Sequence, residues 1–265
     1  MRRYHFAIVL STACFWAAST AALDLDALTS PVLFRGDSKT AYRDPAAIYH
    51  DGVFHLYFTM VKSEDDGTPF LHTAWSKSRD LRQWTPPTIF TPHDRNLNFS
   101  SPGNVIRFSN QWVLCLQTYP RPNGETYGNE TSRLWIMRSD DLEHWGAPEL
   151  LRVKGPDVPV EKMGRMIDPY LVEDKDEPGK WWCFFKQNGA SRAWSRDLKT
   201  WSDEGLLTLG QKEWSWAQGR LAAGFVLDLR REPRFGKALL FFHGSAYPEK
   251  DPRGGFDTFA SLGIA

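Results

Sequence analysis

A seven-residue phrase, Ser-x-Asp-Leu-x-x-Trp, occurs three times in this chain of 265 residues, at positions 78–84, 139–145 and 195–201. Successive copies begin about 60 residues apart, a period longer than that of helical repeats and suited to a four-stranded propeller blade. In each copy the Ser and Asp side chains can bond nearby backbone amides, and the Leu and Trp can bury against a sheet. We interpret the phrase as a structural turn between two strands and predict an all-β propeller.

An apolar strand, a turn and an aromatic strand precede each of these turns. Such hairpins are predicted at 46–58, 104–114 and 170–185. A fourth hairpin is predicted at 224–242, with no further copy of the phrase after it. Four units are therefore visible, and the pattern favours a five-bladed β-propeller whose fifth blade is incomplete at the C-terminal end. A closed four-bladed ring is the alternative. In either case residues 31–35 are free to pair with a late strand and close the ring, which removes an exposed sheet edge.

Composition predicts one ordinary globular core. Hydrophobic residues make up 42% of the chain, and 32 Lys and Arg residues balance 32 Asp and Glu residues. Because no basic excess is present, nucleic acid and anionic membrane surfaces are disfavoured as partners. The 12 Trp, 8 Tyr and 17 Phe residues suit both packing between blades and stacking on sugar rings.

The N-terminus has the pattern of an export signal. Arg2 and Arg3 precede an apolar run from Phe6 to Ala18, and small residues follow as far as Ala22. The run is shorter than the ~20 apolar residues that span a bilayer, which disfavours a membrane anchor. We expect a signal peptide at 1–22, a single propeller domain at 23–265, a secreted or periplasmic location and no membrane association after cleavage.

The cysteines predict no disulfide framework and no zinc site. Cys14 leaves with the signal, whereas Cys115 and Cys183 lie in hydrophobic strand segments of different repeats. We expect these two to be buried thiols, because they occupy non-identical strand positions and lack the spacing of metal ligands.

Equivalent positions at the start of the innermost strands converge on one mouth of a propeller channel. These positions carry Asp44-Pro45, Ser101-Pro102, Asp168-Pro169 and, approximately, Gln218-Gly219. Two carboxylates from different blades thus face one cavity, as glycoside cleavage requires. The alternative is that Asp-Pro only begins a strand, with the aspartate bonding the backbone.

These features resemble the five-bladed β-propeller glycoside hydrolases, most closely family 43, with families 32 and 117 more distant. The resemblance covers residues 30 to 265 and rests on Arg43-Asp44-Pro45, on Ile167-Asp168-Pro169 and on the three turns. It implies that Asp44 is the general base that activates water and that Asp168 orients the acid and tunes its pKa. The family's general acid is a Glu in a Glu-Gly-Pro phrase, where this chain has Gln218, so the resemblance predicts lost or altered catalysis.

Two other residues are candidates for the acid. Glu213 lies five residues before Gln218 on what we expect to be the same loop, and His243 follows the fourth aromatic strand. Glu213 could equally be a solvated charge, and His243 could be a core residue, an aid to the channel or a ligand to a central ion. We expect no required cofactor and assign no metal from one histidine.

Substrate contacts are expected from residues around these carboxylates. Trp214 and Trp216 could stack on a sugar face or pack in the core, and Ser101 lines the mouth. Arg43 and Arg165 could bind an anionic sugar or hold the aspartates ionised, and the sequence leaves both open.

The sequence thus predicts an exported glycoside hydrolase that acts on plant or algal polysaccharide fragments, by inversion according to the resemblance. A carbohydrate-binding propeller that has lost its acid is the alternative, supported by Gln218. A structural interaction propeller leaves the paired Asp-Pro sequences unexplained, and a phosphorylase would use the arginines to hold phosphate. The sequence predicts neither the sugar nor the oligomeric state.

Overall fold

The computed structural model describes residues 33–125, 127–210, 213–214, 221–229, 233–234, 236–245 and 260–264. All of them belong to one compact unit, Val32–Ala265. The predicted signal segment, 1–22, lies outside the described residues. No helix in the described ranges is both long and apolar enough to cross a membrane.

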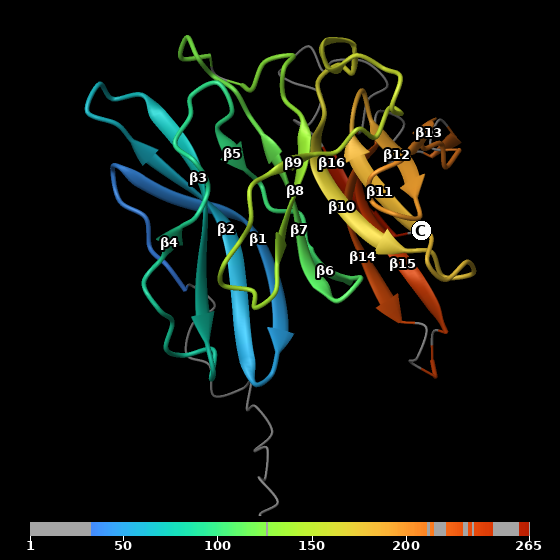
Figure 1. Ribbon diagram of the computed structural model, residues 1–265, viewed down its shortest axis with the longest axis horizontal. Helices are drawn as coiled ribbons and strands as arrows, with labels where there is room; N and C mark the ends of the chain where they lie inside the picture. Colours follow the sequence, from blue (N-terminus) through green and yellow to red (C-terminus); the bar gives the residue numbers. More distant parts are fainter. Residues whose placement is uncertain are drawn as a thin grey trace, which may run out of the picture. The chain divides into compact units, whose positions relative to one another are not determined.

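The described residues form four antiparallel sheets in chain order (Figure 1). The first contains β1 (Thr40–His50), β2 (Val53–Ser63), β3 (Pro69–Ser78) and β4 (Thr88–Ile89). In the second, β5 (Phe99–Ser100) and β6 (Val105–Phe108) both pair with β7 (Gln111–Thr118), which is followed by β8 (Leu134–Ser139) and β9 (Glu149–Leu150). The third contains β10 (Ile167–Glu173), β11 (Trp181–Lys186), β12 (Ala190–Ser195) and β13 (Ser202–Leu206). The fourth contains β14 (Leu221–Leu229), β15 (Lys237–Ser245) and β16 (Ala260–Ile264).

The predicted all-β repeat is confirmed. A short 3-10 turn, η1 (Val160–Lys162), lies between β9 and β10. β5 and β6 are two parts of one innermost strand, since both pair with β7 in a single antiparallel direction. Three sheets therefore have the four-stranded organisation of a blade, and three strands of a fourth are described.

The hairpin turns have the backbone that their sequences favour. Between β1 and β2, Asp51 and Gly52 have φ of 47° and 78°, and between β6 and β7, Ser109 and Asn110 have φ of 46° and 64°. Two consecutive positive φ values are typical of the type I′ turn, whose twist matches that of the flanking strands. The hairpin predicted at 46–58 is confirmed, with its turn at Asp51 and Gly52.

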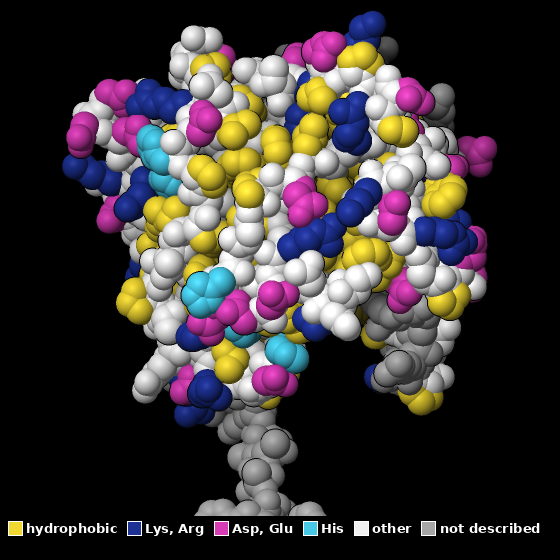
Figure 2. Space-filling view, in the orientation of Figure 1, with side chains coloured by type: hydrophobic (Ala, Val, Ile, Leu, Met, Phe, Trp, Pro, Cys, Tyr) yellow, Lys and Arg dark blue, Asp and Glu magenta, His cyan; other side chains and the backbone are white. Residues whose placement is uncertain are grey.

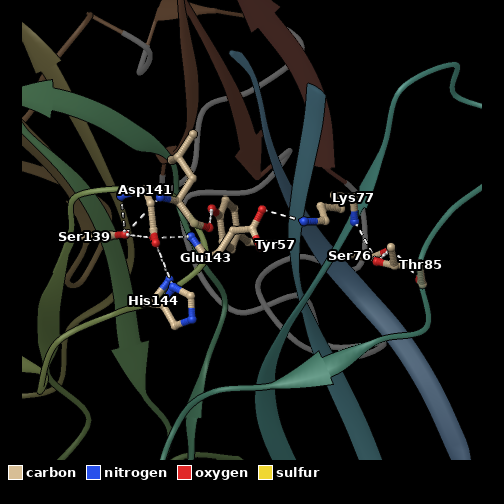
Figure 3. Close-up of polar contacts among 9 residues, drawn as sticks. Tyr57, Ser76, Lys77, Thr85, Ser139, Asp141, Glu143 and His144 are labelled. Atoms are coloured by element: carbon tan, nitrogen blue, oxygen red, sulfur yellow. Dashed lines mark hydrogen bonds and ion pairs between the residues drawn. The ribbon is translucent and has the colours of Figure 1, made fainter. Parts of the chain in front are cut away.

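The repeated phrase forms the turn from the third to the fourth strand of each complete sheet. In the second copy, the amides of Leu142 and Asp141 donate to Ser139 Oγ at 2.9 and 3.2 Å, and those of His144 and Glu143 donate to Asp141 Oδ1 at 2.8 and 2.9 Å (Figure 3). Leu142 has a φ of 68°, and the equivalent leucines have φ of 59° and 56°. The side chains thus satisfy amides that the tight turn leaves without backbone partners.

The turns also fasten one sheet to the preceding one. Tyr57 of β2 donates its hydroxyl to the carbonyl of Leu142 at 2.6 Å (Figure 3). The rings of Tyr57 and Trp145 pack edge to face at a centroid distance of 5.4 Å. Trp201 of the third copy is buried in the cluster between the second and third sheets. Each of these tryptophans therefore fills the space between its own sheet and the sheet before it.

Apolar clusters separate the sheets in chain order. One lies between the first and second sheets around Tyr57 and Leu114, a second around Cys115 and Cys183 between the second and third, and a third around Leu221 between the third and fourth. On the face in view, Figure 2 shows acidic and basic side chains interspersed over this core. The balanced charge of the sequence is thus spread over that surface.

Two sequence predictions are resolved by this packing. Cys115 and Cys183 are buried and unpaired, as expected, and burial raises the pKa of Cys115 to about 12. The expected closing strand at 31–35 is not found in its described part. Leu33 to Arg35 form no strand. Phe34 packs instead on the first sheet, in the cluster that contains Phe58, with 5.3 Å between the two ring centroids.

The turn aspartates predict an acid-sensitive stability. The amides of Thr200 and then Lys199 lower the pKa of Asp197 from its ordinary 3.8 to about 2. Because the folded-state pKa is the lower one, the stabilisation is complete above about pH 4 and is lost as the pH falls toward about 2. We expect Asp197→Asn to flatten the pH dependence of the urea midpoint in that window.

Asp51→Asn is the control, because the contact of the Asp51 carboxylate within the described part of the chain is with the His50 side chain. An unchanged slope for Asp197→Asn would contradict this role of the turn.

Candidate active site

Three strand-start residues share a strained backbone. Asp44, Ser101 and Asp168 have φ of 55°, 46° and 56°, and each precedes a proline. The pairing of β1 with β2 and that of β10 with β11 shift by one residue at the aspartates, which marks a β-bulge. A left-handed non-glycine residue costs on the order of 1–3 kcal/mol, and such residues cluster at functional sites. Because two of these three outliers are aspartates, this end of the sheets is the candidate site.

Hydrogen bonds between sheets hold two of these residues, Ser101 and Asp168, by their backbone amides. The backbone amide of Ser101 donates to Thr59 Oγ1 of the first sheet at 2.7 Å, and that of Asp168 donates to Gln117 Oε1 of the second sheet at 2.6 Å. Thr59 and Gln117 occupy equivalent register positions, since they pair with Arg43 and Ser100. The same contact thus links the strand starts of the second and third sheets to the sheet before each.

The Asp44 carboxylate is bound through one oxygen. Its Oδ2 accepts hydrogen bonds from Thr59 Oγ1 at 2.8 Å and from Ser101 Oγ at 3.0 Å, and it lies 3.2 Å from Arg43 Nε. The Asp44 side chain is 34% exposed and that of Arg43 is 49% exposed. Asp44 is therefore held on its protein side and open to solvent on the other, which suits a group that contacts a ligand.

Arg165 is held by the loop after β7. Its Nε donates to the carbonyl of Gly128 at 2.9 Å, and its guanidinium lies 5.5 Å from the centre of the Tyr119 ring. These contacts fix the loop from 119 onward beside the strand that carries Asp168. The ligand contact predicted for Arg165 stays a prediction.

The register of the fourth sheet corrects one sequence assignment. Ala222 pairs with His243, and the pairing shifts between Ala223 and Phe225, as it does between Arg43 and Ala46 in the first sheet. Ala222, Ala223 and Gly224 therefore occupy the places of Arg43, Asp44 and Pro45. By this register Ala223, and not the approximately placed Gln218, is the residue of the fourth sheet that corresponds to Asp44. Gln218 and Gly219 themselves lie outside the described residues.

The remaining candidates lie on or near the preceding loop. Trp216 and Gln218 lie outside the described residues. Glu213 is exposed, and its amide donates to the carbonyl of Gly210 at 3.1 Å. Trp214 is half-buried against the cluster that contains Leu221, as its core-packing alternative predicted.

His243 has a backbone position that sequence reasoning did not assign. Through its pairing with Ala222 it takes the register position that Thr59 and Gln117 have in the first two sheets. Lys186 has that position in the third sheet, opposite Ile167. Sequence reasoning named His243 but missed Thr59 and Gln117, although each is a polar residue close to an apolar stretch of its strand. Among the described residues, no group of three His, Cys, Asp or Glu side chains could hold a metal ion.

No protein-family model and no curated protein matches the chain. Solved structures do match its backbone. A protein from Parabacteroides distasonis described as a glycoside hydrolase has a TM-score of 0.57 and 17% identity, over 84% of this chain and 68% of that one. An exo-1,5-alpha-L-arabinanase from a bovine ruminal metagenomic library has a TM-score of 0.55 and 16% identity, over 87% and 72%.

A third match comes from the GH130 family of mannoside phosphorylases, which contains glycoside hydrolases that target beta-1,2 mannosidic linkages in Candida mannan. It has a TM-score of 0.56 and 14% identity, over 84% of this chain and 66% of that one. This chain thus spans about two thirds of the length of these proteins. At such identities the matches show a shared β-propeller-like fold.

The link between sheets predicts a specific loss of stability. Gln117 is buried, and Gln117→Leu would leave the Asp168 amide without its acceptor. We expect a loss of about 1–3 kcal/mol in the free energy of unfolding, measured by urea denaturation. Gln111→Leu, at the other end of β7, is the control and is expected to change it by less than about 0.5 kcal/mol. Equal effects of the two substitutions would argue against the link.

Proposed function

We propose that this protein is a carbohydrate-active enzyme that hydrolyses glycosidic bonds, with Asp44 as its general base. The observation that carries the proposal is the pair of aspartates, Asp44 and Asp168, at equivalent strained strand starts of two sheets. They lie at one end of a fold that glycoside hydrolases share. Hydrolysis of a glycosidic bond uses two carboxyl groups placed on either side of it.

In the proposed reaction, the exposed part of the Asp44 carboxylate accepts a proton from a water molecule that attacks the anomeric carbon. The bond to the leaving oxygen then breaks as an acid protonates that oxygen. Asp168 would orient this acid. Inversion at the anomeric carbon is the outcome that we propose, and it requires carboxyl groups about 6.5–9.5 Å apart.

The acid is the open element of this mechanism. The strand start of the fourth sheet carries Ala222 and Ala223, so it supplies no carboxyl group. Glu213, on the chain leading to β14, is the acid that we propose, because it is exposed and lies eight residues before that strand.

The substrate that we propose is a plant or algal oligosaccharide, met outside the cell or in the periplasm after removal of residues 1–22. Neutral sugars such as arabinose fit the balanced charge of the protein and the arabinanase among its structural matches. Arg43 would contact the sugar together with the Asp44 carboxylate that it neighbours.

A second candidate function is carbohydrate binding without catalysis. The alanines at the fourth strand start favour it, because Asp44 and Asp168 would then serve as hydrogen-bond acceptors for sugar hydroxyls. This candidate predicts saturable binding of an oligosaccharide with no product.

The test is product release from arabinose, xylose, galactose and mannose oligosaccharides. We expect Asp44→Asn to lower kcat at least about a hundredfold, since a positioned general base contributes roughly 10²–10⁴. Asp51→Asn, at the opposite end of β1, is the control and should leave kcat unchanged. Binding of an oligosaccharide by the wild type without product would support the second candidate and contradict hydrolysis.

The acid has its own test. We expect Glu213→Gln to lower kcat on unactivated glycosides by roughly 10²–10⁴ as well, and to lower it less on substrates with a good leaving group, which need less protonation. A Glu213→Gln enzyme that retains full activity on unactivated glycosides would exclude Glu213 as the acid.

A further inference from the structure

We propose that Thr59 is a positioning residue that holds the Asp44 carboxylate with Oδ1 facing the reacting water. The inference rests on the proposed function and specifies which oxygen of Asp44 acts. Thr59 lies on β2, opposite Arg43, and is fully buried. It therefore does not touch the substrate and would act through Asp44.

The direction of the Thr59 hydrogen bonds is fixed by its neighbours. The backbone amide of Ser101 can only donate, and it donates to Thr59 Oγ1 at 2.7 Å. The single hydroxyl proton of Thr59 is then available for Asp44 Oδ2, 2.8 Å away, because a carboxylate can only accept. The Thr59 hydroxyl thus accepts a hydrogen bond from Ser101 of the second sheet and donates one to Asp44 of its own sheet.

The two oxygens of Asp44 are consequently unlike. Oδ2 faces three donors, namely the hydroxyls of Thr59 and Ser101 and the Nε of Arg43. One carboxylate oxygen has about two lone-pair sites, so these three donors occupy Oδ2 fully. Within the described residues Oδ1 has no hydrogen bond or ion pair. Oδ1 is therefore the oxygen that remains to take a proton from water.

The arrangement also explains why the strained backbone of Asp44 persists. A left-handed residue before proline is retained only where surrounding contacts over-determine it. Thr59 and Ser101 supply such contacts from two different sheets. The orientation of the base is thereby tied to the packing of the first sheet against the second.

The test compares Thr59→Val with Thr59→Ser. Valine has nearly the same shape and removes the hydroxyl, whereas serine keeps it. We expect Thr59→Val to lower kcat roughly 10- to 100-fold with KM changed less than about threefold, because a small misplacement of a catalytic group costs about that much. Thr59→Ser should recover most of the rate. An active wild type with a Thr59→Val variant of equal kcat would overturn the inference.

Thr73→Val is the matched control. Thr73 lies directly opposite Thr59 on β3, is equally buried, and its hydroxyl has no hydrogen-bond partner among the described groups. It should leave kcat unchanged. If Thr59→Val does not fold, Ser101→Ala removes a single donor from Oδ2 and should still lower kcat several-fold; full activity of this variant would then overturn the inference.

A stability cycle separates this inference from the proposed function. Asp44→Gly removes the carboxylate and tolerates the left-handed backbone. If Thr59 holds Asp44, Thr59→Val and Asp44→Gly together should destabilise the protein by less than the sum of the two single effects. Product-free wild-type protein would refute hydrolysis, whereas additive effects in the cycle would refute the hold on Asp44.

Discussion

The hydrogen bond from a strand-start amide to a side chain of the preceding sheet is the contact on which the candidate site depends. It occurs between Ser101 and Thr59 and again between Asp168 and Gln117. In both cases a buried side chain of one sheet satisfies a donor that the bulge removes from the ladder of the next. The backbone geometry of Ser101 and of Asp168 therefore depends on the packing of each sheet against the preceding one.

Packing at the other end of the sheets has the complementary role. The tryptophans of the second and third phrases fill the space before their own sheets, and Tyr57 reaches the turn at Leu142. Shape and apolar burial set the distance between sheets there, and hydrogen bonds set the orientation at the site. The two ends together leave the strand starts little freedom to move, which is the condition for preorganised chemistry.

The fourth sheet differs from this plan in a way that bears on mechanism. Its bulge is retained, but Ala223 stands where the first and third sheets have an aspartate. A fold can keep the backbone of a site and replace its side chains, because the bulge depends on pairing and the chemistry depends on the carboxyl group. The proposed hydrolysis therefore needs a proton donor from a loop such as the one carrying Glu213. Without such a donor, the proposal is carbohydrate binding without catalysis.

The sequence by itself determined the repeat, the strand order, the turns and the equivalence of Asp44, Ser101 and Asp168, because each depends on local spacing and on residues with strong conformational preferences. Its approximate placement of the fourth strand start at Gln218 differs from the register position, Ala223, which only strand pairing reveals. Only the tertiary structure identified Thr59 and Gln117. Their partners lie on other sheets, more than 40 residues away along the chain, and no local pattern records such a contact.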